Sequence, residues 1–126
     1  MVSKISRTRE NLELPDEWYS SIEKSREKAK KLLKRLIAVN LNTSIIVGRL
    51  EDVGVDKLWR LKYPFCKLTL SKPEKYNMDG KLESKLGDEQ VCFVSKPQMI
   101  MDVDELSERY PEIHEEVHIR MRKEGL

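Results

Sequence analysis

Apolar residues recur at helical spacing through the first third of the chain. Pro15 suits the first turn of a helix, and Asp16 and Glu17 suit its positive end. One amphipathic face of this kind predicts a long helix that ends near residues 40–42. The polar residues 1–13 show no period, and we expect them to form a flexible arm. The predicted stripe consists of Trp18, Ile22, Ala29, Leu32, Leu33, Leu36 and Val39.

The middle of the chain changes to the shorter period of strands. Residues 44–50 form a short β-branched run, which is typical of a buried strand. Alternation of apolar and charged residues predicts two further strands at 59–63 and 66–70, separated at Pro64. A last strand is predicted at 90–94.

Two polar segments interrupt these strands. Residues 52–56 surround Gly54 and are typical of a turn. Residues 71–90 carry turn signals at Asp79-Gly80 and Gly87-Asp88, which predict a mobile hairpin or loop.

The C-terminal part returns to helical spacing. Asp102, followed three residues later by Glu105, is typical of a capping box at a helix start. Pro111 cannot sit comfortably inside a helix, so a break is expected at Tyr110. The pattern therefore predicts a short helix at 102–109 and a second helix at 111–123.

These elements predict an α+β fold in a chain of 126 residues. We expect a long N-terminal amphipathic helix, a small and mostly antiparallel sheet of three to four strands, and a C-terminal helical pair. Residues 14–126 are long enough to form a single domain with its own core.

Composition indicates a cytoplasmic protein. The two cysteines, Cys66 and Cys92, lie in apolar runs, which favours reduced buried thiols, with one bridge between neighbouring strands as the alternative. No apolar run approaches the roughly 20 residues of a membrane span. The N-terminal residues carry positive charge without a hydrophobic stretch after it, so we expect no secretory signal.

The net charge of +2 conceals an uneven distribution. Residues 24–75 carry a net charge of +9, residues 76–126 carry −5, and residues 1–23 carry −2. A basic middle and an acidic C-terminal part indicate either two partners or two segments that attract each other.

Basic and aromatic residues interleave in the predicted strand at 59–63 and just after it. Basic side chains bind phosphates and exposed aromatic faces stack on bases, so this mixture favours single-stranded nucleic acid. Cations on the first helix can also contact a nucleic-acid backbone. Ordinary alternation is the other interpretation, with aromatic side chains in the core and cations in water. The candidate nucleic-acid-binding residues are Lys28, Lys31, Lys34, Arg35, Trp59, Arg60, Lys62, Tyr63 and Lys67.

The two histidines, His114 and His118, enclose the string His-Glu-Glu-Val-His. On a helix they share one face, so both imidazoles can reach one metal ion. The string resembles the H-E-x-x-H signature of zincin metalloproteases, which implies these histidines as zinc ligands and Glu115 as general base. Glu112 and Glu116 are charged where that family has neutral residues. The other interpretation is a pair of surface histidines among carboxylates.

We therefore predict a small non-enzymatic, nucleic-acid-associated binding protein that uses the basic central region. One alternative is a protein-interaction or assembly module, with self-association included. A second alternative is a zinc metallohydrolase built on His114 and His118. The sequence predicts no catalytic residue and no cofactor. The expected partners are DNA or RNA, or a protein, and no membrane.

Overall fold

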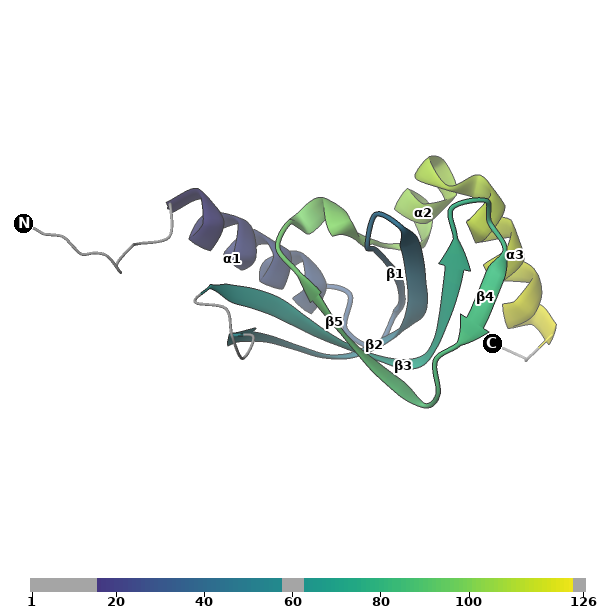
Figure 1. The fold of residues 1–126 in the computed structure, drawn as a ribbon, viewed down its shortest axis with the longest axis horizontal. Coiled ribbons are helices and arrows are strands. Elements are labelled where there is room, and N and C mark those ends of the chain that lie inside the picture. Colours follow the sequence, from purple (N-terminus) through teal and green to yellow (C-terminus); the bar gives the residue numbers. More distant parts are fainter. Residues whose placement is uncertain (1–15, 58–62, 124–126) are drawn as a thin grey trace, which may run out of the picture.

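The fold is α+β, as predicted, and the described residues form three α-helices and one six-stranded antiparallel sheet (Figure 1). The computed structural model describes residues 16–57 and 63–123. The predicted arm at 1–13 and most of the predicted strand at 59–63 lie outside these residues. The helices are α1 (Asp16–Lys30), α2 (Val103–Arg109) and α3 (Pro111–Lys123), with a short 3-10 helix, η1 (Pro97–Met99). The strands are β1 (Leu36–Asn40), β2 (Ser44–Lys57), β3 (Pro64–Asn77), β4 (Leu82–Lys85), β5 (Glu89–Val94) and β6 (Ile100–Met101).

The long hairpin of β2 and β3 forms the centre of the sheet. The strands follow the order β4-β3-β2-β1-β6, and β5 also pairs with β3. The two edge strands share one side of β3: β5 pairs with Cys66–Ser71, and β4 pairs with Glu74–Tyr76. Figure 1 shows that the sheet curves strongly between these two pairings, with α1 beside one end and α2–α3 beside the other.

The curve coincides with an irregular register between β2 and β3. Val47 pairs with Glu74, but Arg49 pairs with Ser71, so β3 contains one residue more than β2 across this step. Lys72 lies in the extra stretch and has a φ of 48°, which is a left-handed backbone conformation. A bulge of this kind bends a sheet and increases its twist.

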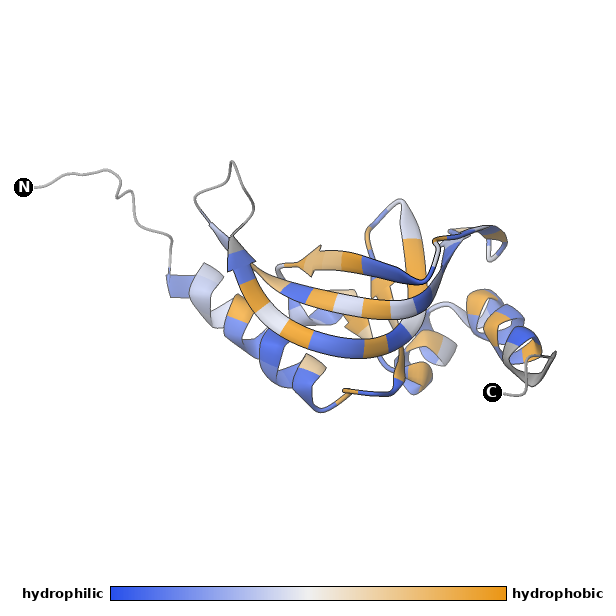
Figure 2. Ribbon diagram, turned by 90° about the horizontal axis from the view of Figure 1, so that it is seen from below, coloured by the Kyte–Doolittle hydropathy of each residue, from blue (hydrophilic) through white to orange (hydrophobic). Residues whose placement is uncertain are grey.

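Apolar side chains cover both faces of the sheet centre. Neighbouring residues of β1 point to opposite faces, and all three central ones are buried. Figure 2 shows the alternation of apolar and polar residues along the longer strands. The α1 core contains Ala29, Leu32, Ile37, Val39, Ile46, Leu50, Cys66, Leu68, Leu70, Cys92, Val94 and Ile100. The C-terminal core contains Ala38, Ile45, Val47, Tyr76, Met101, Leu106, Ile113 and Val117.

The first helix is shorter than predicted, and β1 was missed. α1 ends at Lys30, and a turn follows in which Lys34 has a φ of 69°. Residues 36–40 then form a strand that is buried on both faces. A strand covered on both faces shows no alternation, so its apolar run fits a helical stripe equally well.

The sheet is larger than the three to four strands predicted. The prediction of a turn at 52–56 was wrong, because β2 runs through it to Lys57. The predicted loop at 71–90 contains the end of β3 and all of β4. The turn at Asp79-Gly80 is confirmed, and Gly80 has a φ of 90°.

The C-terminal helical pair is confirmed. The Asp102 side chain accepts a hydrogen bond from the backbone N–H of Glu105, and the Glu105 side chain accepts one from that of Asp102. This capping box starts α2, and Pro111 starts α3. Cys66 and Cys92 are buried free thiols. Among the described residues, no helix is long and apolar enough to cross a membrane.

Candidate nucleic-acid interface

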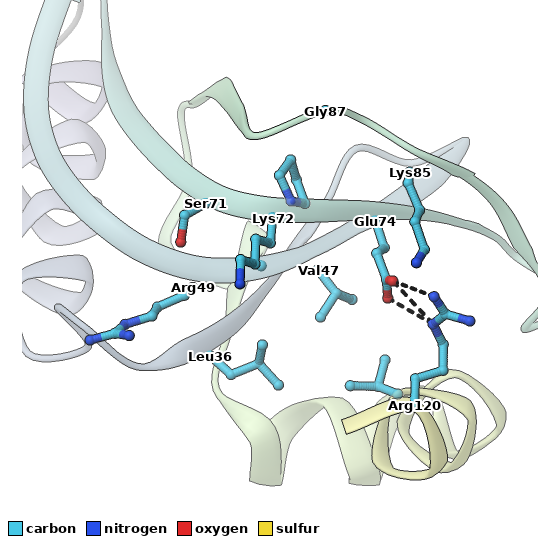
Figure 3. Close-up of a pocket in the computed structure, with 12 residues that line it drawn as sticks. Leu36, Val47, Arg49, Ser71, Lys72, Glu74, Lys85, Gly87 and Arg120 are labelled. Carbon is cyan, nitrogen blue, oxygen red and sulfur yellow. Dashed lines mark hydrogen bonds and ion pairs between the residues drawn. The ribbon is translucent and has the colours of Figure 1, made fainter. Parts of the chain in front are cut away.

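A pocket of about 300 Å³ lies at the bend of the sheet, facing α3 (Figure 3). This bend pocket is formed by four strands, the segment between β4 and β5, and one helix. Because these segments are far apart in the sequence, the pocket exists only in the folded chain. The residues that line it are Leu36, Val47, Gly48, Arg49, Ser71, Lys72, Pro73, Glu74, Lys85, Gly87, Val117 and Arg120.

The middle of the bend pocket is apolar. Leu36 on β1 and Val47 on β2 contribute from the sheet, and Val117 contributes from α3. Val47 and Val117 belong to the C-terminal core, and Leu36 packs against it. The pocket is therefore a gap at the margin of that core, where α3 does not fully cover the sheet.

An ion pair forms one side of the bend pocket. Nε of Arg120 donates to both carboxylate oxygens of Glu74 at 3.1 Å, and its Nη2 donates to Oε2 at 2.6 Å. The hydroxyl of buried Tyr76 donates to Oε1 of Glu74 at 3.0 Å. Burial alone would raise the pKa of Glu74, but the bonds from Arg120 and Tyr76 hold it below its ordinary value of 4.5. The pair ties α3 to β3.

Cations from the turn after α1 and from the bulge lie on the other side of the pocket. Glu51 accepts from Nζ of Lys34 at 2.7 Å and from the hydroxyl of Ser71 at 2.7 Å. Nε of Arg49 lies 3.6 Å from the same carboxylate. These contacts, with Lys34 and Ser71 foremost, lower the pKa of Glu51. We call Lys34, Arg35, Arg49 and Lys72 the basic rim; all four are exposed.

Figure 3 shows Arg49 and Lys72 on one side of the pocket, and Glu74, Arg120 and Lys85 on the other. The pocket lining carries four cationic side chains against the single carboxylate of Glu74. The bend pocket therefore combines an apolar middle with an excess of positive charge at its margins. Such a lining favours an organic anion over a neutral molecule.

Lys28 on α1 and Lys31 directly after it lie in a different setting. Nζ of Lys28 donates to Glu105 at 2.9 Å and to the carbonyl of Pro97 at 3.2 Å, so it connects α1 to α2 and η1. Lys31 is exposed, and Glu23 and Glu27 lie in the same shallow surface depression. The outer face of α1 is therefore mixed in charge.

Of the predicted strand residues, Lys67 points away from α1, whereas Tyr63 lies beside Trp18 of α1. Lys67 alternates with Cys66 and Leu68, whose side chains lie in the α1 core, so it faces the outer side of the sheet. Its Nζ lies 3.9 Å from Asp56. Tyr63 is exposed, and its ring centroid lies 5.8 Å from that of Trp18. Trp59, Arg60 and Lys62 lie outside the described residues.

The structure thus divides the nine predicted residues. Lys34 and Arg35 belong to the basic rim, Lys28 lies on α1, Lys31 lies in the turn after it, and Lys67 lies on the outer sheet face. Sequence reasoning missed Arg49, Lys72, Lys85 and Arg120. The basic excess over 24–75 was a signal for Arg49 and Lys72 alone, because Lys85 and Arg120 lie in the acidic part of the chain. The convergence of all four depends on the bulge and on the packing of α3.

The histidine pair lies on the surface of α3. The imidazoles of His114 and His118 are stacked, with ring centroids 6.3 Å apart and an interplanar angle of 10°. His118 is exposed and His114 is partly buried. Among the described residues, no group of three or more histidines, cysteines or carboxylates could hold a metal ion. The metal site therefore stays a prediction with two ligands, because the part of the chain that the structure describes brings no third ligand of the kind that a catalytic zinc needs to them.

The chain matches no protein-family model, no curated protein and no solved structure.

Proposed function

We propose that this protein is a non-enzymatic binding protein for nucleic acid, and that the basic rim contacts the phosphate backbone. The observation that carries this proposal is the convergence of Lys34, Arg35, Arg49 and Lys72 at the bend of the sheet. Lys34 and Arg49 both contact the carboxylate of Glu51 here, and Arg35 and Lys72 are exposed in the neighbouring turn and bulge. Each phosphate that they neutralise releases a counterion, which favours binding.

The bend pocket next to the rim favours a single strand as the ligand. The bases of a duplex are stacked and paired inside it, whereas a single strand can present a base to an adjoining apolar surface. Leu36 and Val47 provide such a surface beside Arg49.

The test is fluorescence anisotropy with single- and double-stranded DNA and RNA at a series of salt concentrations. We expect single strands to bind more tightly and affinity to fall steeply as salt rises. The double variant Arg49→Gln/Lys72→Gln should weaken binding and reduce the slope of log K against log salt by about 1.4, since each lost phosphate contact contributes roughly 0.7.

The matched control is Lys24→Gln/Lys96→Gln, which removes two exposed cations away from the rim. It should leave the slope close to that of the wild type. Absence of binding at low salt would overturn the proposal, and so would equal losses in the two double variants.

A protein-interaction module is the second candidate, because β5 forms an uncovered edge. It pairs with β3, and no other described strand pairs with it. Unpaired edges can add a strand from another chain. Val91 and Phe93 point to the outer sheet face together with Lys67. If β5 pairs with a second copy of the chain, Val91→Lys should reduce self-association in sedimentation experiments. A wild-type protein that stays monomeric at high concentration would contradict self-association.

A further inference from the structure

We propose that the bend pocket is a subsite for one nucleotide, with its phosphate at Arg49 and Lys72 and its base against Leu36, Val47 and Val117. This inference rests on the proposed function, because the nucleotide is taken to be part of a bound nucleic-acid strand. It adds a specific place for a base, which contact between cations and a backbone does not require.

The chemistry of the two pocket margins sets the orientation of the ligand. Arg49 and Lys72 form a margin without a carboxylate in the pocket lining, whereas Glu74 lies at the opposite margin with Arg120 (Figure 3). At the opposite margin the Arg120 guanidinium is already engaged by Glu74, so a phosphate dianion is attracted more strongly to the first margin, where it competes with Glu51 for Arg49. The flat, less polar base is therefore directed to the apolar middle.

The size of the pocket suits a ligand of this kind. About 300 Å³ is at the lower end of the roughly 300–1,000 Å³ of small-molecule sites. A pocket of this volume admits one nucleotide unit but not a stretch of stacked bases. The subsite therefore predicts that a strand must turn one base out of its stack.

The walls of the pocket are held in place without a ligand. Arg120 and Glu74 fix α3 against β3, and a Cβ at Gly48 would lie only 3.0 Å from Leu70 and 3.1 Å from Ser71, so β2 and β3 approach closely here. A pre-formed site loses little conformational entropy on binding, which favours affinity.

The first experiment is methyl NMR of the full chain with three probes: adenosine 5′-monophosphate, inorganic phosphate and a single-stranded oligothymidylate. The methyl groups of Leu36, Val47 and Val117 should shift saturably with the oligonucleotide and with the mononucleotide. Inorganic phosphate should leave them nearly unchanged, because it has no base. The methyl groups of Ile46 and Leu68, in the α1 core, are the internal control.

The second experiment blocks the pocket from β1. Leu36→Trp places a large side chain in the middle of the pocket and should weaken oligonucleotide binding about tenfold, the loss of one base contact. The matched control is Leu33→Trp, three residues earlier in the exposed turn before β1. It should change the affinity less than twofold. Thermal unfolding of both variants verifies that they fold.

The outcomes separate this inference from the proposed function. The subsite is overturned if the oligonucleotide binds in a salt-sensitive way while the pocket methyl signals stay unchanged and the two tryptophan variants bind with equal affinity. The proposed phosphate contacts of the basic rim would then still stand. The proposed function is overturned if the methyl signals of the pocket shift with adenosine monophosphate while no oligonucleotide binds. The ligand of the pocket would then be a free nucleotide. If inorganic phosphate, which has no base, shifts the methyl signals of the pocket as strongly as the nucleotide does, the role of the base is overturned.

Discussion

At the scale of single residues, charged side chains in this protein are used mainly to connect segments. Arg120 connects α3 to β3 through Glu74, and Lys28 connects α1 to α2 through Glu105. Their side chains are about one-fifth to one-third exposed, so water screens these pairs less than a surface pair. The Glu74 pair has the shorter contact and the greater burial of the two, and should contribute more to stability.

Replacing Glu74 by Gln should therefore destabilise the fold by about 1–3 kcal/mol at neutral pH, because it leaves the Arg120 charge without its carboxylate. The pKa of Glu74 is lower in the folded state than its ordinary value of 4.5. Its ionised form thus stabilises the fold above that value, and this contribution is lost as pH falls through the folded pKa. Urea unfolding across this pH range should show the wild type and the variant converging in acid.

The control is Glu83→Gln, which removes the partner of Lys75 from an exposed pair at 3.6 Å. It should cost no more than about 0.5 kcal/mol. If both variants lose the same stability, the Glu74 pair does not hold α3 in place.

At the scale of elements, the sequence predicted those that have one covered face or a clear boundary signal. Asp102 and Pro111 mark the starts of α2 and α3, and both helices lie where they were predicted. β1 was missed because Ile37, Ala38 and Val39 are all buried, which removes the alternation of a strand. The bulge at Lys72 left no sequence signal beyond a polar stretch, so the bend pocket could not be predicted.

The close approach of β2 and β3 at the bend makes a prediction about Gly48. A Cβ there would lie 3.0 Å from the Cβ of Leu70 and 3.1 Å from the carbonyl oxygen of Ser71. Gly48→Ala should therefore cost about 1–3 kcal/mol through overpacking. Gly54, in the same strand, has open space around it, and Gly54→Ala should stay within about 0.5 kcal/mol. Chemical denaturation measures both, and equal stability of the two variants contradicts the close packing at the bend.

At the scale of the whole molecule, two cores share one sheet. β1 and β2 contribute side chains to the α1 core through one face and to the C-terminal core through the other. Within the described residues, the two cores therefore cannot be separated without breaking the pairing between strands. The single domain over 14–126 stays a prediction from the sequence, whereas the site could not be predicted because only the folded sheet brings its residues together.

Shared strands predict that both cores unfold together. Leu106→Ala, in the C-terminal core, should cost about 2–5 kcal/mol and lower the stability of the α1 core by the same amount. Methyl NMR signals of Leu68 and Ile113 report on the two cores and should disappear at the same urea concentration. Val103→Ala, at an exposed position of the same helix, is the control and should have little effect. Loss of the Ile113 signal before that of Leu68 would show that the two cores are independent.

Glu51 has a consequence for how the basic rim receives a ligand. Its carboxylate already occupies the place between Lys34 and Arg49 that a phosphate would take, with the Ser71 hydroxyl as a further donor. The protein thus carries its own substitute anion, which keeps the two cations in position while the site is empty. For the proposed binding, a phosphate has to displace Glu51, so we expect the rim to favour ligands that bring several negative charges at once over weakly charged molecules.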